Sequence, residues 1–277
     1  MRLDKGICLQ AIAVLSLGTL SHLTCAASSS TAQPALENSS PQQNTIWGLG
    51  LGSPFAKFQT LNPKLAIQLG WFGASDGSSQ HININGAIGD QFTPTNKGNS
   101  NSNGLFGVGV YVDGHQFNYA SLSYGVNAFY LAPASIGGVV TQENLFENLS
   151  YGYSLTNWPI YFGAKANIKN SYTERANLTL DVGIGPNIMT SKFNEAQIEP
   201  STIPDHIFAG TTTVTFTAMA GVGIRFNNAI GQVPLECGYR FFYLGDANFN
   251  TLTDQVTSKF QANNNYANAI VCGLTFG

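Results

Sequence analysis

A period-two alternation of apolar and polar side chains constrains this chain more than any other feature. It recurs along the C-terminal two-thirds and is clearest in the segments Arg175–Met189 and Thr211–Phe226. Because successive side chains of a strand point to opposite faces, each segment is predicted to be a β-strand with one apolar face. The residues on these apolar faces are Ala176, Leu178, Leu180, Val182, Ile184, Pro186 and Ile188 in the first segment, and Val214, Phe216, Ala218, Ala220, Val222, Ile224 and Phe226 in the second.

The opposite face of these strands indicates what surrounds them. In the first segment it includes Asn177, Thr179, Asp181 and Gly183, which are too small and polar to form a shared dry core. Strands of this kind are typical of a membrane barrel with lipid outside and a polar lumen inside. The charged fraction of 10% agrees, because an average soluble protein has about 25%. The sequence therefore predicts an all-β fold, an antiparallel up-and-down transmembrane β-barrel.

The N-terminus predicts export. Residues 1–26 have the pattern of a secretory signal peptide, with Arg2 and Lys5 ahead of the apolar stretch Ile7–Leu20 and small residues around Cys25 for cleavage. A transmembrane anchor is the alternative, but the apolar stretch is shorter than the roughly 20 residues that a spanning helix needs. Lipidation at Cys25 is a second alternative. An exported chain with many amphipathic strands is expected in a bacterial outer membrane.

Three regions are predicted along the chain. Residues 1–26 form the signal peptide, residues 27–62 a flexible extension rich in Ser, Gln, Pro and Asn, and residues 63–277 the barrel. The predicted strands of the barrel are Lys64–Phe72, Leu105–Val112, Phe117–Leu131, Tyr151–Ile168, Arg175–Met189, Thr211–Phe226, Val233–Gly245 and Asn265–Phe276.

Short and long connections alternate between the predicted strands. The turns after the second, fourth and sixth strands are short, the first of them a hairpin at Val112–His115, and the other connections, including a loop at 132–150, are long. Outer-membrane barrels have short periplasmic turns and long extracellular loops, so this asymmetry supports the fold independently. Eight strands are predicted. The alternative is ten, if Ile46–Leu51 and His81–Ala87 are strands as well.

With these features the chain resembles the small outer-membrane β-barrels of Gram-negative bacteria, of the opacity-protein or OmpA-transmembrane-domain type. The resemblance covers about residues 64–277 and rests on the signal peptide, the Gly/aromatic alternation and a terminal alternating series. Members of the family usually end on the final aromatic residue of this series, whereas here Gly277 follows it. The series is Tyr266, Asn268, Ile270, Cys272, Leu274 and Phe276. The resemblance implies a monomer that is folded by the barrel-assembly machinery, contacts outer-membrane lipid and binds host or surface ligands through its loops.

Two cysteines lie on the last two predicted strands. The hairpin between these strands is centred near Asp254, and antiparallel pairing about that point places Cys237 almost opposite Cys272, both on the outward face. Directly opposed residues have Cα atoms about 4.5–5.5 Å apart, which is within disulfide range, and the periplasm is oxidising. The sequence leaves two possibilities, a cross-strand disulfide or two small apolar residues facing lipid.

Five charged residues share the inward face of the strands: Lys165, Asp181, Arg225, Glu236 and Arg240. Isolated charges in a narrow lumen are costly, so we expect them to pair with one another. Since side chains can fill the interior of an eight-stranded barrel, a salt-bridged plug is favoured over an ion pathway. In this arrangement Glu236 and Arg240 share a face, and Asp181 and Lys165 lie on adjacent strands.

The sequence does not predict an enzyme. Some outer-membrane barrels are lipid A deacylases, palmitoyl transferases or proteases, and these need a His with a nucleophile or paired acids at the rim. After residue 26 the histidines are His81, His115 and His206, and neither His81 nor His206 matches the His-x-Ser-Asn pattern of the deacylases. No metal-ligand spacing, phosphate loop or nucleotide fingerprint appears, so we expect no cofactor and no metal.

The predicted function is a structural or surface-interaction role, adhesin-like, carried by extracellular loops on a rigid barrel. A small passive pore is the alternative, and an enzyme that modifies lipid or peptide in the outer leaflet is a further one. With a formal net charge of −3 and no basic run, nucleic acid is not an expected partner. Aromatic residues near strand ends are expected to form interfacial girdles. They are Trp71, Tyr111, Tyr124, Tyr130, Trp158, Tyr161, Phe241 and Tyr243.

Overall fold

The computed structural model describes residues 62–75, 77–84, 88–173, 175–204 and 206–277. The predicted signal peptide, the extension up to residue 61 and the segment Ile46–Leu51 lie outside this part of the chain, so they stay predictions. Within the described residues, none of the secondary structure is a helix long and apolar enough to cross a membrane.

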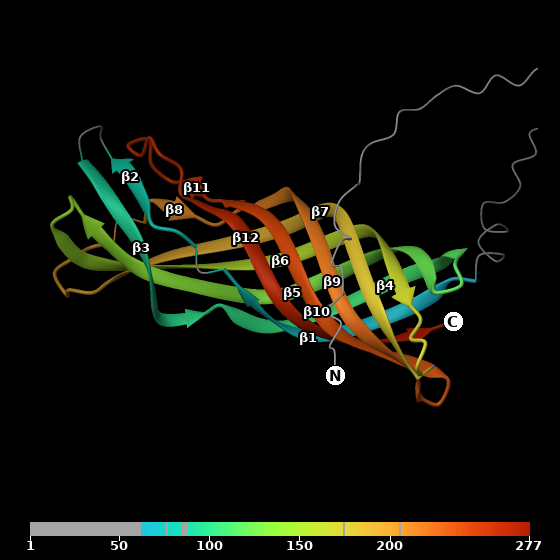
Figure 1. Ribbon diagram of the computed structural model, residues 1–277. Helices are drawn as coiled ribbons and strands as arrows, with labels where there is room; N and C mark the ends of the chain where they lie inside the picture. Colours follow the sequence, from blue (N-terminus) through green and yellow to red (C-terminus); the bar gives the residue numbers. More distant parts are fainter. Residues whose placement is uncertain (1–61, 76, 85–87, 174, 205) are drawn as a thin grey trace, which may run out of the picture. The chain divides into compact units, whose positions relative to one another are not determined.

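Eight long antiparallel strands form a closed ring (Figure 1). The ring closes where the last strand pairs with the first, in a register that runs from Leu65 opposite Phe276 to Ala74 opposite Ala267. The prediction of an eight-stranded up-and-down barrel is therefore confirmed. The strands are, in order around the ring, β1 (Lys64–Ala74), β4 (Ser102–Gln116), β5 (Ala120–Gln142), β6 (Phe146–Ile168), β7 (Ala176–Gln197), β9 (Thr212–Ile230), β10 (Val233–Asn248) and β12 (Gln261–Phe276).

The strand β2 (Gln80–Ile84) overlaps a segment of the ten-strand alternative. It pairs with β3 (Ile88–Ser100), which in turn pairs with the upper part of β5, so both strands extend the sheet at one end and neither enters the ring. Figure 1 shows β2 and β3 at the end of the barrel opposite to the C-terminus. The ring therefore has eight members, and the ten-stranded alternative is wrong for the described residues.

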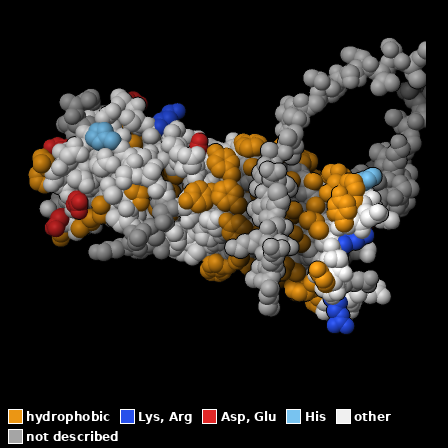
Figure 2. Space-filling model, viewed as in Figure 1, with side chains coloured by type: hydrophobic (Ala, Val, Ile, Leu, Met, Phe, Trp, Pro, Cys, Tyr) orange, Lys and Arg blue, Asp and Glu red, His pale blue; other side chains and the backbone are white. Residues whose placement is uncertain are grey.

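The outer face of the ring is apolar. Trp71 exposes 61% of its surface, Phe162 61% and Ile270 60%, although in a water-soluble fold such side chains would be buried. Figure 2 shows hydrophobic side chains gathered over the barrel strands and sparser towards the end that holds β2 and β3. These exposed apolar side chains, which alternate with inward-facing ones along each strand, form a belt around the ring, as expected of a surface that contacts hydrocarbon. Its further members include Leu69, Phe106, Val110, Val126, Leu180, Val182, Ile184, Phe216, Val222, Ile224 and Phe226.

Three strands are much longer than a membrane requires. A tilted membrane strand needs about 9–11 residues, whereas β5 and β6 have 23 each and β7 has 22. Their far ends form a ribbon beyond the belt, and the connection between β5 and β6 is a tight turn at Glu143–Leu145. The predicted loop at 132–150 is therefore wrong. The pairing continues through Gly137 and Gly138 because alternate residues on both strands, such as Ile136 and Tyr153, are buried.

The short hairpin predicted at Val112–His115 lies slightly further along the chain. β4 continues to Gln116, and the chain reverses at Phe117–Tyr119, where the N–H of Phe117 donates to the carbonyl of Ala120 (2.7 Å). Strand pairing continues because Asp113 lies opposite Ser123 on β5 and its carboxylate binds Lys64 of β1 at 2.7 Å. A contact with a third strand thus overrides a local turn signal.

The part of the molecule beyond the belt, which we call the cap, has its own aromatic core. The cap consists of β2, β3, β8 (Phe208–Ala209), β11 (Asn250–Thr251) and the outer ends of β5, β6, β7, β10 and β12. Phe260 is 1% exposed, and its ring lies 5.2–5.9 Å from those of six other residues, so the cap is a packed structure rather than a set of independent loops. These six are Phe92, Tyr151, Tyr153, Phe193, Phe208 and Phe249.

Candidate functional site

Four of the five predicted lumen charges form ion pairs inside the ring. Lys165 of β6 binds Glu236 of β10 at 2.8 Å, and Arg240 of β10 binds Asp181 of β7 at 2.8 Å. Arg240 also lies 3.6 Å from Glu236, so the two pairs form one chain of alternating charge. All four side chains are at most 13% exposed, which places the charges in a desolvated layer where pairing is required.

The ion pairs of Lys165 and Asp181 are not formed between these two residues, although they lie on adjacent strands. Lys165 and Asp181 occupy directly opposed positions on β6 and β7, as the sequence indicates. In the structure, however, Lys165 reaches Glu236 across the lumen, and Asp181 pairs with Arg240. Each residue of this layer has another residue of the layer within 4 Å, so the layer is compact enough to fill the narrow interior.

Neutral polar side chains extend the charged layer. The guanidinium of Arg240 donates a hydrogen bond to the side-chain oxygen of Gln68, which is 3% exposed. The amide of Gln68 donates to Asn127 (3.3 Å), and the amide of Asn127 donates to the phenol oxygen of Tyr111 (2.7 Å). These hydrogen bonds join β1, β4, β5 and β10 across the lumen. Tyr111 thus faces inward and is not part of an interfacial girdle.

An apolar layer closes the lumen on the cap side of the charges. Phe129, Tyr161 and Phe242 are at most 1% exposed, and their ring centroids lie 5.3–6.1 Å apart. The guanidinium carbon of Arg240 lies 5.5 Å from the centroid of Phe129, which joins the two layers directly. The lumen therefore contains an aromatic layer as well as the polar side chains that the sequence predicts. Tyr161 belongs to this layer and bonds Thr217 at 2.8 Å, so it is not a girdle residue either.

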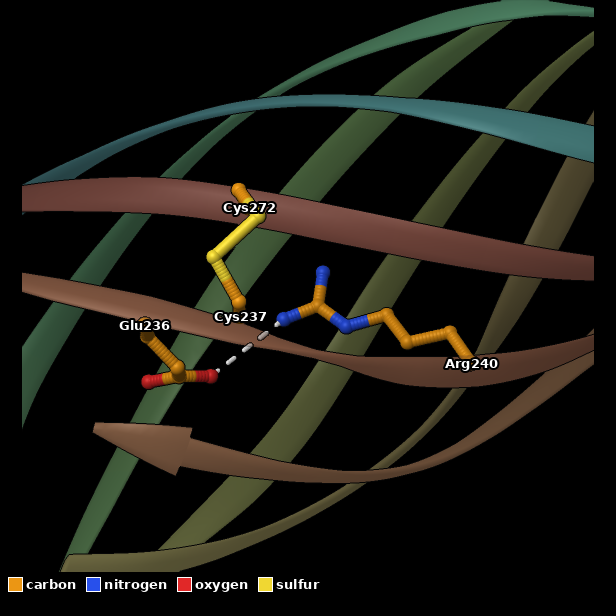
Figure 3. The surroundings of a disulfide bond; sticks show 4 residues. All are labelled: Glu236, Cys237, Arg240 and Cys272. Carbon is orange, nitrogen blue, oxygen red and sulfur yellow. Dashed lines mark ion pairs between the residues drawn. A yellow bond between two sulfur atoms is a disulfide. The ribbon is translucent and has the colours of Figure 1, made fainter.

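Cys237 and Cys272 lie directly opposite one another on β10 and β12, and in the structure their sulfur atoms are joined. Figure 3 shows the bond bridging the two neighbouring strands, with the Glu236–Arg240 contact formed from the same stretch of β10. Next to the bond, Leu69 is the β1 partner of Cys272 and is 62% exposed. The disulfide therefore lies on the outer face, within the apolar belt.

The three histidines that follow residue 26 lie on different elements. His81 lies on β2 in the cap, and His115 lies at the end of β4 that is opposite to the cap, where its ring is 4.4 Å from that of Phe117. His206 is in the connection after β7, and its backbone N–H donates to the carboxylate of Glu195 at 2.8 Å. Among the described residues, no three His, Cys, Asp or Glu side chains are placed to hold a metal ion.

No protein-family model matches the chain, and no curated protein matches it. Three solved structures with similar folds are Neisserial surface protein A, OprG from Pseudomonas aeruginosa and the outer membrane protease OmpT from Escherichia coli. They are 12%, 11% and 11% identical, with TM-scores of 0.37, 0.43 and 0.39. The matches cover 77–78% of this chain and 95–97% of theirs.

At these identities and TM-scores the likeness says nothing about the role of this chain. The assignment of this chain rests on its own closed ring, apolar belt and short turns at one end. The chain therefore has the architecture of a small outer-membrane β-barrel, as the sequence predicts.

Proposed function

We propose that this protein is a plugged outer-membrane barrel that holds a rigid, folded cap at the cell surface, where the cap makes surface contacts in an adhesin-like or structural role. The observation that carries the proposal is the continuation of β5, β6 and β7 well beyond the belt into a cap with a buried aromatic core. Binding surfaces are commonly built where loops are held by a rigid scaffold, and the cap meets that description.

The exposed surface of the cap is suited to contact with water and polar partners. On the ribbon of β5 and β6, most side chains that alternate with the buried ones are small, and several are polar, as at Ser135, Ser150 and Ser154. On β2, His81 and Asn83 are exposed, while Ile82 between them is 1% exposed. The cap therefore buries its aromatic core inward, opposite to the belt, although a few apolar residues at its turns, such as Leu145 and Leu252, are exposed.

The structure of the lumen argues against the passive pore. A conducting barrel needs a continuous water path, whereas here an ion-paired layer and an aromatic layer follow one another within the ring. The histidines likewise give no support to an enzyme at the rim, because they lie on three different elements. A surface role through the cap is the function that the geometry supports best.

The test is a variant that shortens the cap and keeps the belt. In this variant, residues 137–152 of the ribbon and residues 192–210 are each replaced by a short Asn-Gly turn. Bacteria that display either form are compared for adherence to cultured epithelial monolayers, for autoaggregation and for detergent sensitivity. We expect the shortened barrel to keep its heat-dependent gel mobility while adherence or envelope integrity falls. If the shortened form folds and all three readouts equal those of the full chain, the proposal is wrong.

A further inference from the structure

A second polar site lies at the periplasmic end of the lumen, below the ion-paired layer. It is a cavity of about 190 Å³ whose lining runs from the rim pair Lys64–Asp113 to Lys165 of the charged layer. The cavity is large enough to hold several water molecules or a small ion. Its remaining lining residues are Tyr111, Gln116, Ser121, Ser123, Asn167, Arg225 and Thr275.

The charges around this cavity do not balance. Lys64 is neutralised by Asp113 at 2.7 Å, and Lys165 by Glu236 at 2.8 Å. Arg225, the fifth of the predicted lumen charges, forms no ion pair with any residue that the structure describes. The residue opposite Arg225 on the neighbouring strand β10 is Glu236, which Lys165 and Arg240 already contact. The cavity and the adjoining charged layer together hold four cations and three carboxylates, an excess of one positive charge.

Two buried polar atoms at the cavity also lack hydrogen bonds. Within the described part of the chain, the Nε of Arg225 and the Oδ1 of Asn167 are buried and have no partner. A buried guanidinium N–H without an acceptor is costly, because it has lost water without gaining a hydrogen bond. Both residues line the same cavity, so one bound group with acceptor oxygens would satisfy the arginine and remove the excess charge.

Hydroxyl groups supply further donors at the same place. The phenol oxygen of Tyr111 accepts a hydrogen bond from Asn127 (2.7 Å), which leaves its own proton for another acceptor. Ser121 and Ser123 line the cavity from β5. A cationic guanidinium, an ammonium group and several hydroxyl donors around one small volume are the groups that bind carboxylates and phosphates in proteins.

From this arrangement we propose that the periplasmic cavity is a binding site for a small soluble oxyanion, a phosphate or a carboxylate, with Arg225 as its principal ligand. The oxyanion comes from the aqueous phase rather than from a lipid headgroup, because the ring of strands is closed and the lining residues face the lumen. This site is at the opposite end of the barrel from the cap, so it is independent of the proposed surface role.

The test follows the Nε–H signal of Arg225 by nuclear magnetic resonance in the folded, full-length protein in zwitterionic micelles. Inorganic phosphate is titrated at constant ionic strength, with chloride as the compensating anion. We expect a saturable shift of the Arg225 signal at millimolar phosphate or below, and no shift of the exposed Arg175. No saturable change, an equal change at Arg175, or an equal response to chloride alone would each overturn the proposal.

A variant pair adds a second readout. Phosphate that binds the folded state raises its melting temperature, and we expect Arg225→Gln to weaken this effect at least tenfold in apparent affinity. Arg175→Gln removes one exposed cation from the same end of the barrel and should leave the phosphate effect unchanged. If both variants respond to phosphate as the parent does, the stabilisation is non-specific and Arg225 is not the ligand.

Discussion

Asp181 on β7 and Arg240 on β10 form an ion pair, 2.8 Å between Oδ2 and Nη2, that crosses over the strand between them. That strand is β9, and the residue opposite both of them is Gly221. A β-carbon at this position would overlap the carboxylate of Asp181 and would lie 3.0 Å from Cγ of Arg240. The absence of a side chain at Gly221 therefore allows a charge pair to form between strands that are not neighbours.

Gly221→Ala is expected to destabilise the barrel by about 2–4 kcal/mol, because the added methyl group displaces a buried carboxylate from its partner. Reversible urea unfolding of the barrel in lipid vesicles measures the difference. The matched control is Gly73→Ala on β1, where a β-carbon meets no atom within 4 Å. That control should stay within about 0.5 kcal/mol of the parent. Equal effects of the two substitutions would show that the close approach at Gly221 is unimportant.

Substitution of Arg240 alone should lower the stability of the barrel more than substitution of both Arg240 and Asp181. Arg240→Met leaves Asp181 and Glu236 in a desolvated layer without a shared cation, and we expect a loss of about 3–5 kcal/mol. In the double variant Arg240→Met/Asp181→Asn one unpaired carboxylate is absent, so part of the loss should be recovered. The same urea unfolding experiment measures both, with the exposed Arg175→Met as the control. A double variant as unstable as the single one would contradict the pairing.

The membership of this layer was predictable from the sequence, but its pairing was not. The in-out alternation of side chains along each strand, which we call strand parity, placed Lys165, Asp181 and Arg240 on the inward face, and the structure agrees. Strand parity describes one strand at a time. Across the narrow lumen, long side chains also reach the opposite wall, so Lys165 binds Glu236 on β10 rather than its neighbour Asp181 on β7. The neutral members Gln68 and Asn127 follow from the same parity, and their uncharged side chains gave no signal on their own.

The ion-paired layer and the aromatic layer should each block the passage of ions through the lumen. The parent protein should show no conductance in planar bilayers. Lys165→Met/Glu236→Gln removes one ion pair, but it should conduct no better, because the rings of Phe129 and Phe242 still exclude water above it. Adding Phe129→Ala and Phe242→Ala to that variant should produce measurable current. Ohmic conductance by the parent protein would contradict the plug and revive the pore.

The cap was harder to predict than the ring. The loop predicted at 132–150 contains Pro133, Gly137 and Gly138, residue types that favour turns, but the pairing of β5 with β6 passes through the glycines. The aromatic core that stabilises these strands comes from segments as distant as Phe92 and Phe260, whose rings lie 5.3 Å apart. Local patterns contain no information about such contacts, so tertiary packing overrode the turn propensities.

The aromatic core of the cap can be tested separately from the barrel. Phe260→Ala leaves a large cavity in a packed core and should cost the cap about 3–5 kcal/mol. Limited proteolysis of intact cells is expected to cut the cap of this variant, while its belt keeps the heat-dependent gel mobility of a folded barrel. Leu252→Ala, at a side chain that is 63% exposed, is the control and should remain resistant. Equal protease resistance of both variants would show that the core does not hold the cap together.

The position of the disulfide between Cys237 and Cys272 leads to a prediction about how easily a reductant reaches it. Their bond links positions 35 residues apart, and in the chain-entropy model a closed loop of that length stabilises the folded state by about 4 kcal/mol. The bond lies between Leu69 on β1 and Ile224 on β9, both exposed members of the belt, so hydrocarbon surrounds it in the membrane. Reduction requires attack by a thiolate, and an anion does not readily enter hydrocarbon.

We therefore expect a water-soluble thiol to leave the disulfide intact in the folded, membrane-embedded barrel and to reduce it once the barrel is unfolded by heating in SDS. Maleimide labelling followed by mass measurement, on envelope fractions with and without heating, counts the free thiols in each state. Cys237→Ser provides the reference for one free thiol, and its lower unfolding temperature should report the lost crosslink. Labelling of both cysteines in unreduced, unheated envelopes would show that the bond does not form, and ready reduction in the folded state would place it away from the lipid.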